Sequence, residues 1–285
     1  MTTRREAIAN AAAALARAGV TDPRREAHRL LADLLEESPG TVVLRGDQVL
    51  APNAVAQFVS TVTRRCAGEP AAQIAGWTEF RRLRIRVNRH VLIPRPETEG
   101  LVDLVFAHAP VGAGRVLDVG TGSGCVALAL ADESAGRLGS VIGVDVSRDA
   151  LAVARANAVA LGLPVRYFAG DLTGAIAPGS MSVVVSNPPY LTAEEHRRLD
   201  PGVRDWEPGL ALVGGVDGLL PYRFLVRDAW RVLVPGGVLA LEVDVSRAAR
   251  VATLARDTGW SAVAVHVDLF GCDRFVTARR GPIHD

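Results

Sequence analysis

The sequence predicts an α/β protein, in which a small helical domain precedes a doubly wound, Rossmann-like parallel sheet and a β-hairpin joins the two. Apolar residues recur with a helical period up to residue 70, which favours helices. The period changes to two between Trp77 and Ile93, which is typical of a hairpin strand. Beyond Glu97, short β-branched segments alternate with helical ones, as in βαβ units. We therefore expect a helical domain at residues 1–72, a hairpin linker at 73–96 and a sheet domain at 97–285.

The helical domain is predicted to contain three helices. Gly19 ends the first, Pro23 lies at the start of the second, Pro39-Gly40 closes the second, and Gly68 closes the third. The apolar positions that define them are Ile8, Ala12 and Leu15, then Leu30, Leu31, Leu34 and Leu35, then Val55, Phe58, Val59 and Val62.

The hairpin segment alternates basic and apolar side chains. The basic positions are Arg82, Arg84 and Arg86, and the apolar positions between and after them are Leu83, Ile85 and Val87. Because successive side chains point to opposite faces of a strand, the three arginines should share one face. Such a row is either a solvated strand face or a surface that steers an acidic partner towards the site.

The sheet domain is predicted from alternating segments. Strand and helix follow one another through RVLDV, CVALALADE, SVIGVD, ALAVARANAVALG, VRYFAG and SVVVSN. A further strand, a helix and a terminal hairpin are expected in GVLALEV, VATLARDTG, WSAVAVHV and RFVTARR.

The composition is that of an ordinary globular protein, with 49% hydrophobic and 22% charged residues, which argues against a disordered or fibrous chain. There is no lysine, which excludes a Schiff-base or P-loop lysine, and the net charge of +1 gives no general attraction to nucleic acid. With no long apolar run and no signal peptide, the chain is expected in the cytoplasm, away from membranes. The widely spaced Cys66, Cys125 and Cys272 fit reduced thiols, and the histidines, His284 included, show no metal-ligand spacing.

A glycine-rich loop follows the first strand of the predicted sheet. It comprises Gly120, Thr121, Gly122, Ser123 and Gly124. Dinucleotide-binding enzymes use Gly-x-Gly-x-x-Gly at this turn, so Gly-x-Gly alone is a weak signal. The Gly-x-Gly-x-Gly spacing with an acid two places ahead is the usual methyltransferase form, and its glycines let the backbone pass close to a bound S-adenosylmethionine.

Acidic residues also end the next two strands. Asp145 can accept hydrogen bonds from two ribose hydroxyls, Asp171 can accept from an adenine amino group, and Leu172 can cover the adenine ring. Either acid alone could equally cap a helix or lie in a solvated turn. Because the three signals occur in order at three successive strand ends, the rule for ligand sites in doubly wound sheets favours one cofactor site.

The fourth strand ends in Asn187, Pro188, Pro189 and Tyr190, the most specific signal in the chain. The prolines fix the backbone and remove two N–H donors, although a proline-rich turn after a strand can also be purely structural. An NH₂ group can donate to the Asn187 side-chain oxygen and the Pro188 carbonyl while Tyr190 packs flat against its plane. Two such acceptors raise the electron density on a weakly nucleophilic amide nitrogen and aim its lone pair at a sulfonium methyl group. Asn187, Pro188 and Tyr190 are therefore the predicted catalytic residues, and all four residues are predicted to bind the substrate.

Together these motifs closely resemble those of the HemK-type glutamine amide methyltransferases, which modify the Gly-Gly-Gln loop of peptide-chain release factors. The resemblance spans nearly the whole chain and includes Gly68-Glu69-Pro70, Gly76, Glu79-Phe80, VLIPRPETE at residues 91–99, DVGTGSG, SNPPY, Glu207-Pro208, Gly214-Gly215, Asp217-Gly218 and Pro235-Gly236-Gly237. It implies a class I methyltransferase sheet, a substrate-recognising helical domain, S-adenosylmethionine as cofactor and class 1 release factors as partners. By position it implies cofactor contacts from the glycine loop, Asp145, Leu172 and Asn187.

Two positions depart from the family pattern. Gln73 stands where the family usually has a tyrosine, and Asp244 stands where it usually has a glycine. Both lie outside the cofactor and acceptor motifs, so they bear on the protein substrate more than on the reaction. Glu207 and Asp217 either order a loop over the site or lie in solvated turns.

Two other functions compete with glutamine methylation. An adenine amino methyltransferase acting on DNA or RNA could use the same clamp, but it needs a basic groove, and residues 1–70 hold nine arginines against eight acids. A non-catalytic binding protein on the same fold is the third possibility, and the complete clamp argues against it.

Overall fold

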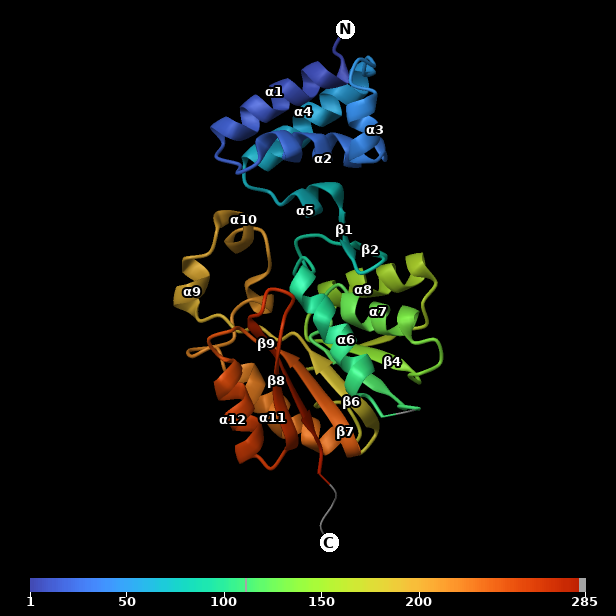
Figure 1. Ribbon diagram of the computed structural model, residues 1–285, viewed down its shortest axis with the longest axis vertical. Helices are drawn as coiled ribbons and strands as arrows, with labels where there is room; N and C mark the ends of the chain where they lie inside the picture. The colour runs from blue at the N-terminus through green and yellow to red at the C-terminus, as the bar shows by residue number, and fades with distance from the viewer. Residues whose placement is uncertain (111, 282–285) are drawn as a thin grey trace. The chain divides into compact units, whose positions relative to one another are not determined.

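The computed structural model describes residues 1–110 and 112–281, which form two compact units (Figure 1). The helical unit comprises Met1–Trp77 together with Asp200–Trp206. The sheet unit comprises Thr78–Leu199 and the residues from Glu207 onward. Residues 200–206, which were expected with the sheet, pack within the helical unit.

The helical unit has long helices where the sequence predicts them and short ones that it does not. Its helices are α1 (Arg4–Arg17), α2 (Pro23–Leu35), α3 (Pro39–Leu44), α4 (Pro52–Cys66), α5 (Ala71–Ala75) and α10 (Pro201–Arg204). Leu15, Leu30 and Phe58 lie in its core, whereas Val59, which was counted with the apolar face of α4, is 58% exposed. Pro39 begins α3 because Ser38 caps it, its Oγ accepting a hydrogen bond from the Thr41 N–H at 3.1 Å.

The sheet unit contains a hairpin, a seven-stranded sheet and flanking helices. The strands are β1 (Trp77–Phe80) and β2 (Leu83–Arg86) of the hairpin, then β3 (Val116–Val119), β4 (Val141–Asp145), β5 (Arg166–Ala169), β6 (Met181–Ser186), β7 (Leu233–Glu242), β8 (Ser261–Val267) and β9 (Asp273–Arg279). The helices are α6 (Glu99–His108), α7 (Cys125–Glu133), α8 (Arg148–Leu161), α9 (Ala193–Arg197), α11 (Leu220–Val232) and α12 (Ala248–Asp257), with short 3-10 helices η1 (Pro96–Thr98) and η2 (Gly209–Ala211).

The sheet has the order β5-β4-β3-β6-β7-β9-β8. The first five strands are parallel, and β9 runs antiparallel to both of its neighbours. Helices α6, α7 and α8 lie on one side of this sheet, and α11 and α12 lie on the other (Figure 1). The predicted Rossmann-like, doubly wound architecture is confirmed.

The topology brings the candidate site residues to one edge of the sheet. Chain order reverses between β3 and β6, which lie side by side although two helices and two further strands separate them in sequence. The carboxyl ends of β3, β4 and β6 therefore meet at the switch point, where doubly wound sheets bind their ligands. Leu117, Val119 and Val184 point into the core shared with α11 and α12, which fixes the faces of β3 and β6.

Candidate active site

The glycine loop leaves β3 with each of its glycines in a left-handed conformation. The φ angles are 68° at Gly120, 54° at Gly122 and 82° at Gly124, a region that residues with a side chain rarely adopt. A Cβ at Gly120 or Gly122 would meet no protein atom within 4 Å, so the backbone there borders open space. A Cβ at Gly124 would instead clash with the Tyr167 hydroxyl. The first two glycines thus leave room for a ligand, and the third allows the loop to pack on β5.

Two side chains of the loop point into the protein. Thr121 and Ser123 are both buried, and the Thr121 hydroxyl donates to Asp118 Oδ2 at 2.6 Å. Asp118 also accepts a hydrogen bond from the Ala127 N–H at 3.2 Å, which ties the end of β3 to the start of α7. Burial raises the pKa of Asp118 to about 7, against the effect of these two hydrogen bonds. Thr121 and Ser123 can therefore offer a ligand their backbone but not their hydroxyl groups.

Asp145 lies against the glycine loop at the end of β4. Its Oδ2 accepts a hydrogen bond from the Gly122 N–H at 2.9 Å, and its Oδ1 accepts one from the Ser147 N–H at 2.9 Å. The carboxylate thus joins the loop to the turn before α8, and each oxygen keeps a lone pair for a further donor.

The residues after β5 differ from one another in exposure. Asp171 is exposed, and Leu172 is half-buried against the core that includes α11. Leu172 has a φ of 49°, which is uncommon for a residue with a bulky side chain. Such strain persists only where the surroundings impose it, and it is concentrated at ligand sites and turns.

The acceptor motif lies directly beside the glycine loop. Val119 and Ser186 are partners in the β3–β6 register, and the Ser186 hydroxyl donates to the Val119 carbonyl at 2.7 Å. Gly120 and Asn187 therefore leave adjacent strands at the same level. Pro188 is buried, Asn187 is half-buried, and burial raises the pKa of the half-buried Tyr190.

A second glycine-rich loop, residues 213–218, packs against the backbone of the acceptor motif and of the residue that follows it. The Gly214 N–H donates to the Leu191 carbonyl at 2.8 Å, beside a parallel bridge between Leu191 and Val213. A Cβ at Gly214 would clash with the Pro189 carbonyl, and one at Gly218 would clash with the Tyr190 carbonyl. Glycine is required at both positions because two backbones meet there.

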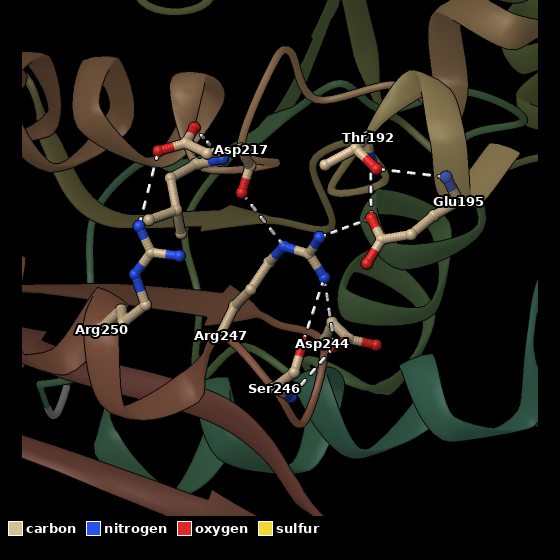
Figure 2. A network of polar contacts seen from close by, with 8 residues as sticks. Thr192, Glu195, Asp217, Asp244, Ser246, Arg247 and Arg250 are labelled. Carbon is tan, nitrogen blue, oxygen red and sulfur yellow. Dashed lines mark hydrogen bonds and ion pairs between the residues drawn. The ribbon is translucent and has the colours of Figure 1, made fainter.

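Arg247, at the start of α12, holds the segments that flank the acceptor motif (Figure 2). Its Nη2 donates to Glu195 Oε2 at 2.6 Å, and its Nε donates to the Asp217 carbonyl at 3.5 Å. Its Nη1 donates to Asp244 Oδ1 at 3.2 Å. The guanidinium is almost fully buried, so it fastens α9 and the loop 213–218 to the turn after β7.

Glu207 is buried and binds the segment before α6, so of the two alternatives for this residue the solvated turn is wrong. It is 5% exposed, and its Oε2 accepts a hydrogen bond from the Ile93 N–H at 2.9 Å. Its Oε1 accepts from Arg95 Nη2 at 2.6 Å. Asp217, in contrast, is only partly covered and pairs with Arg223 at 2.5 Å and Arg250 at 3.5 Å.

Sequence reasoning missed Thr98 and Glu242, two buried residues that contact the acceptor motif or its partner. Asn187 Nδ2 donates to Thr98 Oγ1 at 3.1 Å, and Thr98 is also a polar neighbour of the Glu242 carboxylate, whose pKa it lowers. Burial raises the pKa of Glu242 to about 7, with Thr98 opposing the shift. A carboxylate inside the apolar strand GVLALEV was the signal available in the sequence, because unpaired buried charges are costly.

The predicted alternation in the hairpin is confirmed. Leu83, Ile85 and Val87 are buried, and the arginines between them are exposed. Arg82 pairs with Asp132 at 2.8 Å. The neighbouring Arg81, which the sequence analysis did not single out, occupies the turn with a φ of 52° and binds Glu133 through two hydrogen bonds.

Among residues 1–110 and 112–281, no group of three or more His, Cys, Asp or Glu side chains could hold a metal ion. His284 lies outside the described residues. None of the described helices has the length and apolar character needed to cross a membrane.

Comparisons with known proteins place the chain in a family. The family model "PrmC N-terminal domain" matches residues 6–76, and "Methyltransferase small domain" matches residues 99–199. A release factor glutamine methyltransferase of Cereibacter sphaeroides is 42% identical over 276 residues, covering 96% of this chain and 97% of the relative. One of Deinococcus radiodurans is 40% identical over 277 residues, covering 97% and 98%.

The chain belongs to the release factor glutamine methyltransferase family. The resemblance expected from the motifs is thereby confirmed. A solved methyltransferase from Pyrococcus furiosus shares the fold, with a TM-score of 0.53 and 18% identity over 81% of this chain and all (100%) of that one. Both family models match within this one chain, the first over the helical unit and the second over part of the sheet unit.

Proposed function

We propose that this protein transfers a methyl group from S-adenosylmethionine to the side-chain amide nitrogen of the glutamine in the Gly-Gly-Gln loop of class 1 release factors. The observation that carries the proposal is the register between Val119 and Ser186, which puts the glycine loop and the acceptor motif side by side. The curated relatives named as release factor glutamine methyltransferases support the choice of substrate. A cytoplasmic location is part of the proposal, because release factors act where proteins are synthesised.

The residues present fit S-adenosylmethionine. Gly120 and Gly122 border open space, and Asp145 keeps a free lone pair on each oxygen for the two ribose hydroxyls. We assign Leu172 to the adenine ring and Asp171 to its amino group, because both follow the next strand end. When bound, the cofactor supplies an electrophilic methyl group on a sulfonium.

The acceptor motif then holds the nucleophile. The Asn187 Oδ1 and the Pro188 carbonyl each accept a hydrogen bond from one N–H of the glutamine amide. Pro189 and Tyr190 pack against the plane of that amide. No side chain needs to act as a strong base, because the nitrogen becomes acidic once it carries the methyl group and can then lose its proton to water. Positioning and oriented dipoles thus supply the rate enhancement.

The test is methyl transfer from labelled cofactor to three acceptors: a class 1 release factor, its loop variant with Ala in place of Gln, and duplex DNA. We expect label on the intact release factor alone. Label on the Ala variant would refute the assigned acceptor, and label on DNA would favour the adenine alternative. The helical unit is assigned to substrate recognition, so its deletion should lower methylation of the intact factor more than binding of the cofactor.

A further inference from the structure

The side-chain amide of Asn187 ends in two polar atoms, an oxygen and a nitrogen, that differ in hydrogen bonding. Its amide oxygen accepts hydrogen bonds, whereas its amide nitrogen only donates them. The proposed reaction needs the oxygen, because the glutamine NH₂ is itself a donor. An Asn amide that rotated by half a turn would present its own NH₂ to the substrate and repel it. The enzyme therefore needs a device that fixes this rotation.

Thr98 provides a contact to the nitrogen side of the amide. Asn187 Nδ2 donates to Thr98 Oγ1 at 3.1 Å, and Thr98 is 3% exposed. Within the described part of the chain no hydrogen-bond donor reaches Asn187 Oδ1. With the nitrogen engaged, the oxygen is left for the acceptor site.

A threonine hydroxyl could also donate to the amide oxygen, so its own proton must be engaged elsewhere. The buried carboxylate of Glu242, at the end of β7, is the acceptor available for that hydroxyl, because Thr98 lowers the pKa of Glu242 as a hydrogen-bond donor does. Glu242 is 3% exposed, and its Oε2 accepts no hydrogen bond from the described residues. An ionised carboxylate has no proton to give, so Thr98 has to donate to it and can only accept from Asn187.

We propose that Thr98 and Glu242 are positioning residues, which act through hydrogen bonds to keep the Asn187 amide oxygen turned towards the substrate amide. The proposal rests on the proposed function, since it assigns a task within the same acceptor site. Neither residue is among those assigned to contact the substrate. Their task is to exclude the unproductive rotation of Asn187.

The arrangement should depend on the ionisation of Glu242. Burial raises its pKa to about 7, whereas Thr98 and two arginines lower it. The charged and titratable groups around it are Arg274 on β9, Arg95 just before η1, Glu97 in η1, Tyr190 after β6, Tyr222 on α11 and Cys125 on α7. Below the pKa, a protonated Glu242 can donate to Thr98, whose hydroxyl is then free to donate to Asn187 Oδ1 and reverse the amide.

The test uses Thr98→Val, which removes the hydroxyl at nearly constant volume, and Thr98→Ser, which restores it. Losing one buried hydrogen bond should lower kcat about tenfold in Thr98→Val, with the KM for the cofactor unchanged. Thr98→Ser should recover most of the loss. Thr258→Val is the matched control, because the Thr258 hydroxyl bonds only backbone carbonyls at the end of α12. It should leave kcat unchanged.

Glu242→Gln tests the charge without removing the acceptor. Its amide oxygen can still accept from Thr98 but does not titrate in this range. The wild-type kcat should fall as the pH drops through about 7, and this acid limb should disappear in Glu242→Gln. An acid limb of the same size in both proteins would overturn the part assigned to Glu242.

A measurement without turnover separates this proposal from the proposed function. In protein labelled with ¹⁵N-asparagine, the Asn187 side-chain amide should exchange slowly in the wild type and rapidly in Thr98→Val. Equal exchange and equal kcat in these two proteins would overturn the proposal. If the wild type left release factors unmethylated, the proposed function would fail while the exchange experiment would still decide how Asn187 is held.

Discussion

Replacing Asp145 with alanine should weaken cofactor binding much more than it weakens the fold. Its two oxygens already accept one backbone N–H each at 2.9 Å, from Gly122 and Ser147, and each has one lone pair left. Two ribose hydroxyls fit these lone pairs, and a hydrogen bond to a charged group contributes roughly 1.5–3 kcal/mol. Losing the equivalent of one such bond predicts an increase in Kd of about 10- to 100-fold, before any disorder of the glycine loop is counted.

Calorimetric titration with S-adenosylmethionine measures the effect directly. Asp145→Asn keeps the shape of the side chain but puts an NH₂ against one of the two backbone N–H groups, so it should be as harmful as alanine. Asp149→Ala is the control, because that carboxylate is exposed in the first turn of α8 and should leave the Kd unchanged. An unaltered Kd in Asp145→Ala would reduce Asp145 to a turn residue and refute its role at the ribose.

Three further predictions test other parts of the sheet unit. Asn187→Ala should lower kcat by a factor of about 100, or about 3 kcal/mol, with cofactor affinity largely kept, and a variant with more than about a tenth of normal turnover would contradict the clamp. Arg95→Ala leaves the buried carboxylate of Glu207 without its cation, so urea unfolding should show a loss of about 2 kcal/mol, whereas Arg227→Ala, which breaks a solvent-exposed pair, should unfold at nearly the wild-type urea concentration. Burial raises the pKa of Asp118 to about 7, so the folded state holds a proton that the unfolded state releases above pH about 4, and stability falls as the pH rises between these values. The Asn side chain does not titrate, so the unfolding free energy of Asp118→Asn minus that of the wild type should rise across this pH range. A constant difference would refute the raised pKa of Asp118.

The strands and most long helices were predictable because their signals are local. Runs such as VIGVD and SVVVSN become β4 and β6, and the end of each parallel strand is fixed by the topology. Helix α11 was missed although its apolar residues recur with a helical period at Tyr222, Leu225 and Val226. The short helices α3, α5, α9 and α10 were not predictable in this way, because four to six residues are too few to show a period.

The candidate site was predictable only where it lies at strand ends. The glycine loop, Asp145 and Asn187 follow β3, β4 and β6, so the rule for doubly wound sheets places them together. The partners that orient them come from distant sequence. Thr98 is 89 residues from Asn187, and Ile93 is 114 residues from Glu207, and no local pattern reports such contacts.

The arginine row shows how a correct pattern can still leave a function open. The arginines do lie on the exposed face, but Arg82 is engaged by Asp132, so the field that this row can exert on an acidic partner is reduced. Exposed ion pairs of this kind contribute little to stability, and salt screens them. Steering of the protein substrate by this row stays a prediction, which the KM at low salt of the variant with Gln at all three positions would test.

The two departures from the family pattern have a common structural effect. Gln73 is buried in the helical unit, where its Nε2 donates to the Trp206 carbonyl at 3.0 Å and fastens the segment 200–206. Asp244 in the sheet unit accepts hydrogen bonds from the Ser246 N–H at 2.9 Å and from Arg247 (Figure 2). A glycine in place of Asp244 would leave Arg247 one carboxylate fewer for the same buried charge. Both residues hold connecting segments through these hydrogen bonds, and within the described part of the chain neither hydrogen-bonds the glycine loop or the acceptor motif. We therefore expect them to bear on how a protein substrate is received more than on the groups that hold its amide.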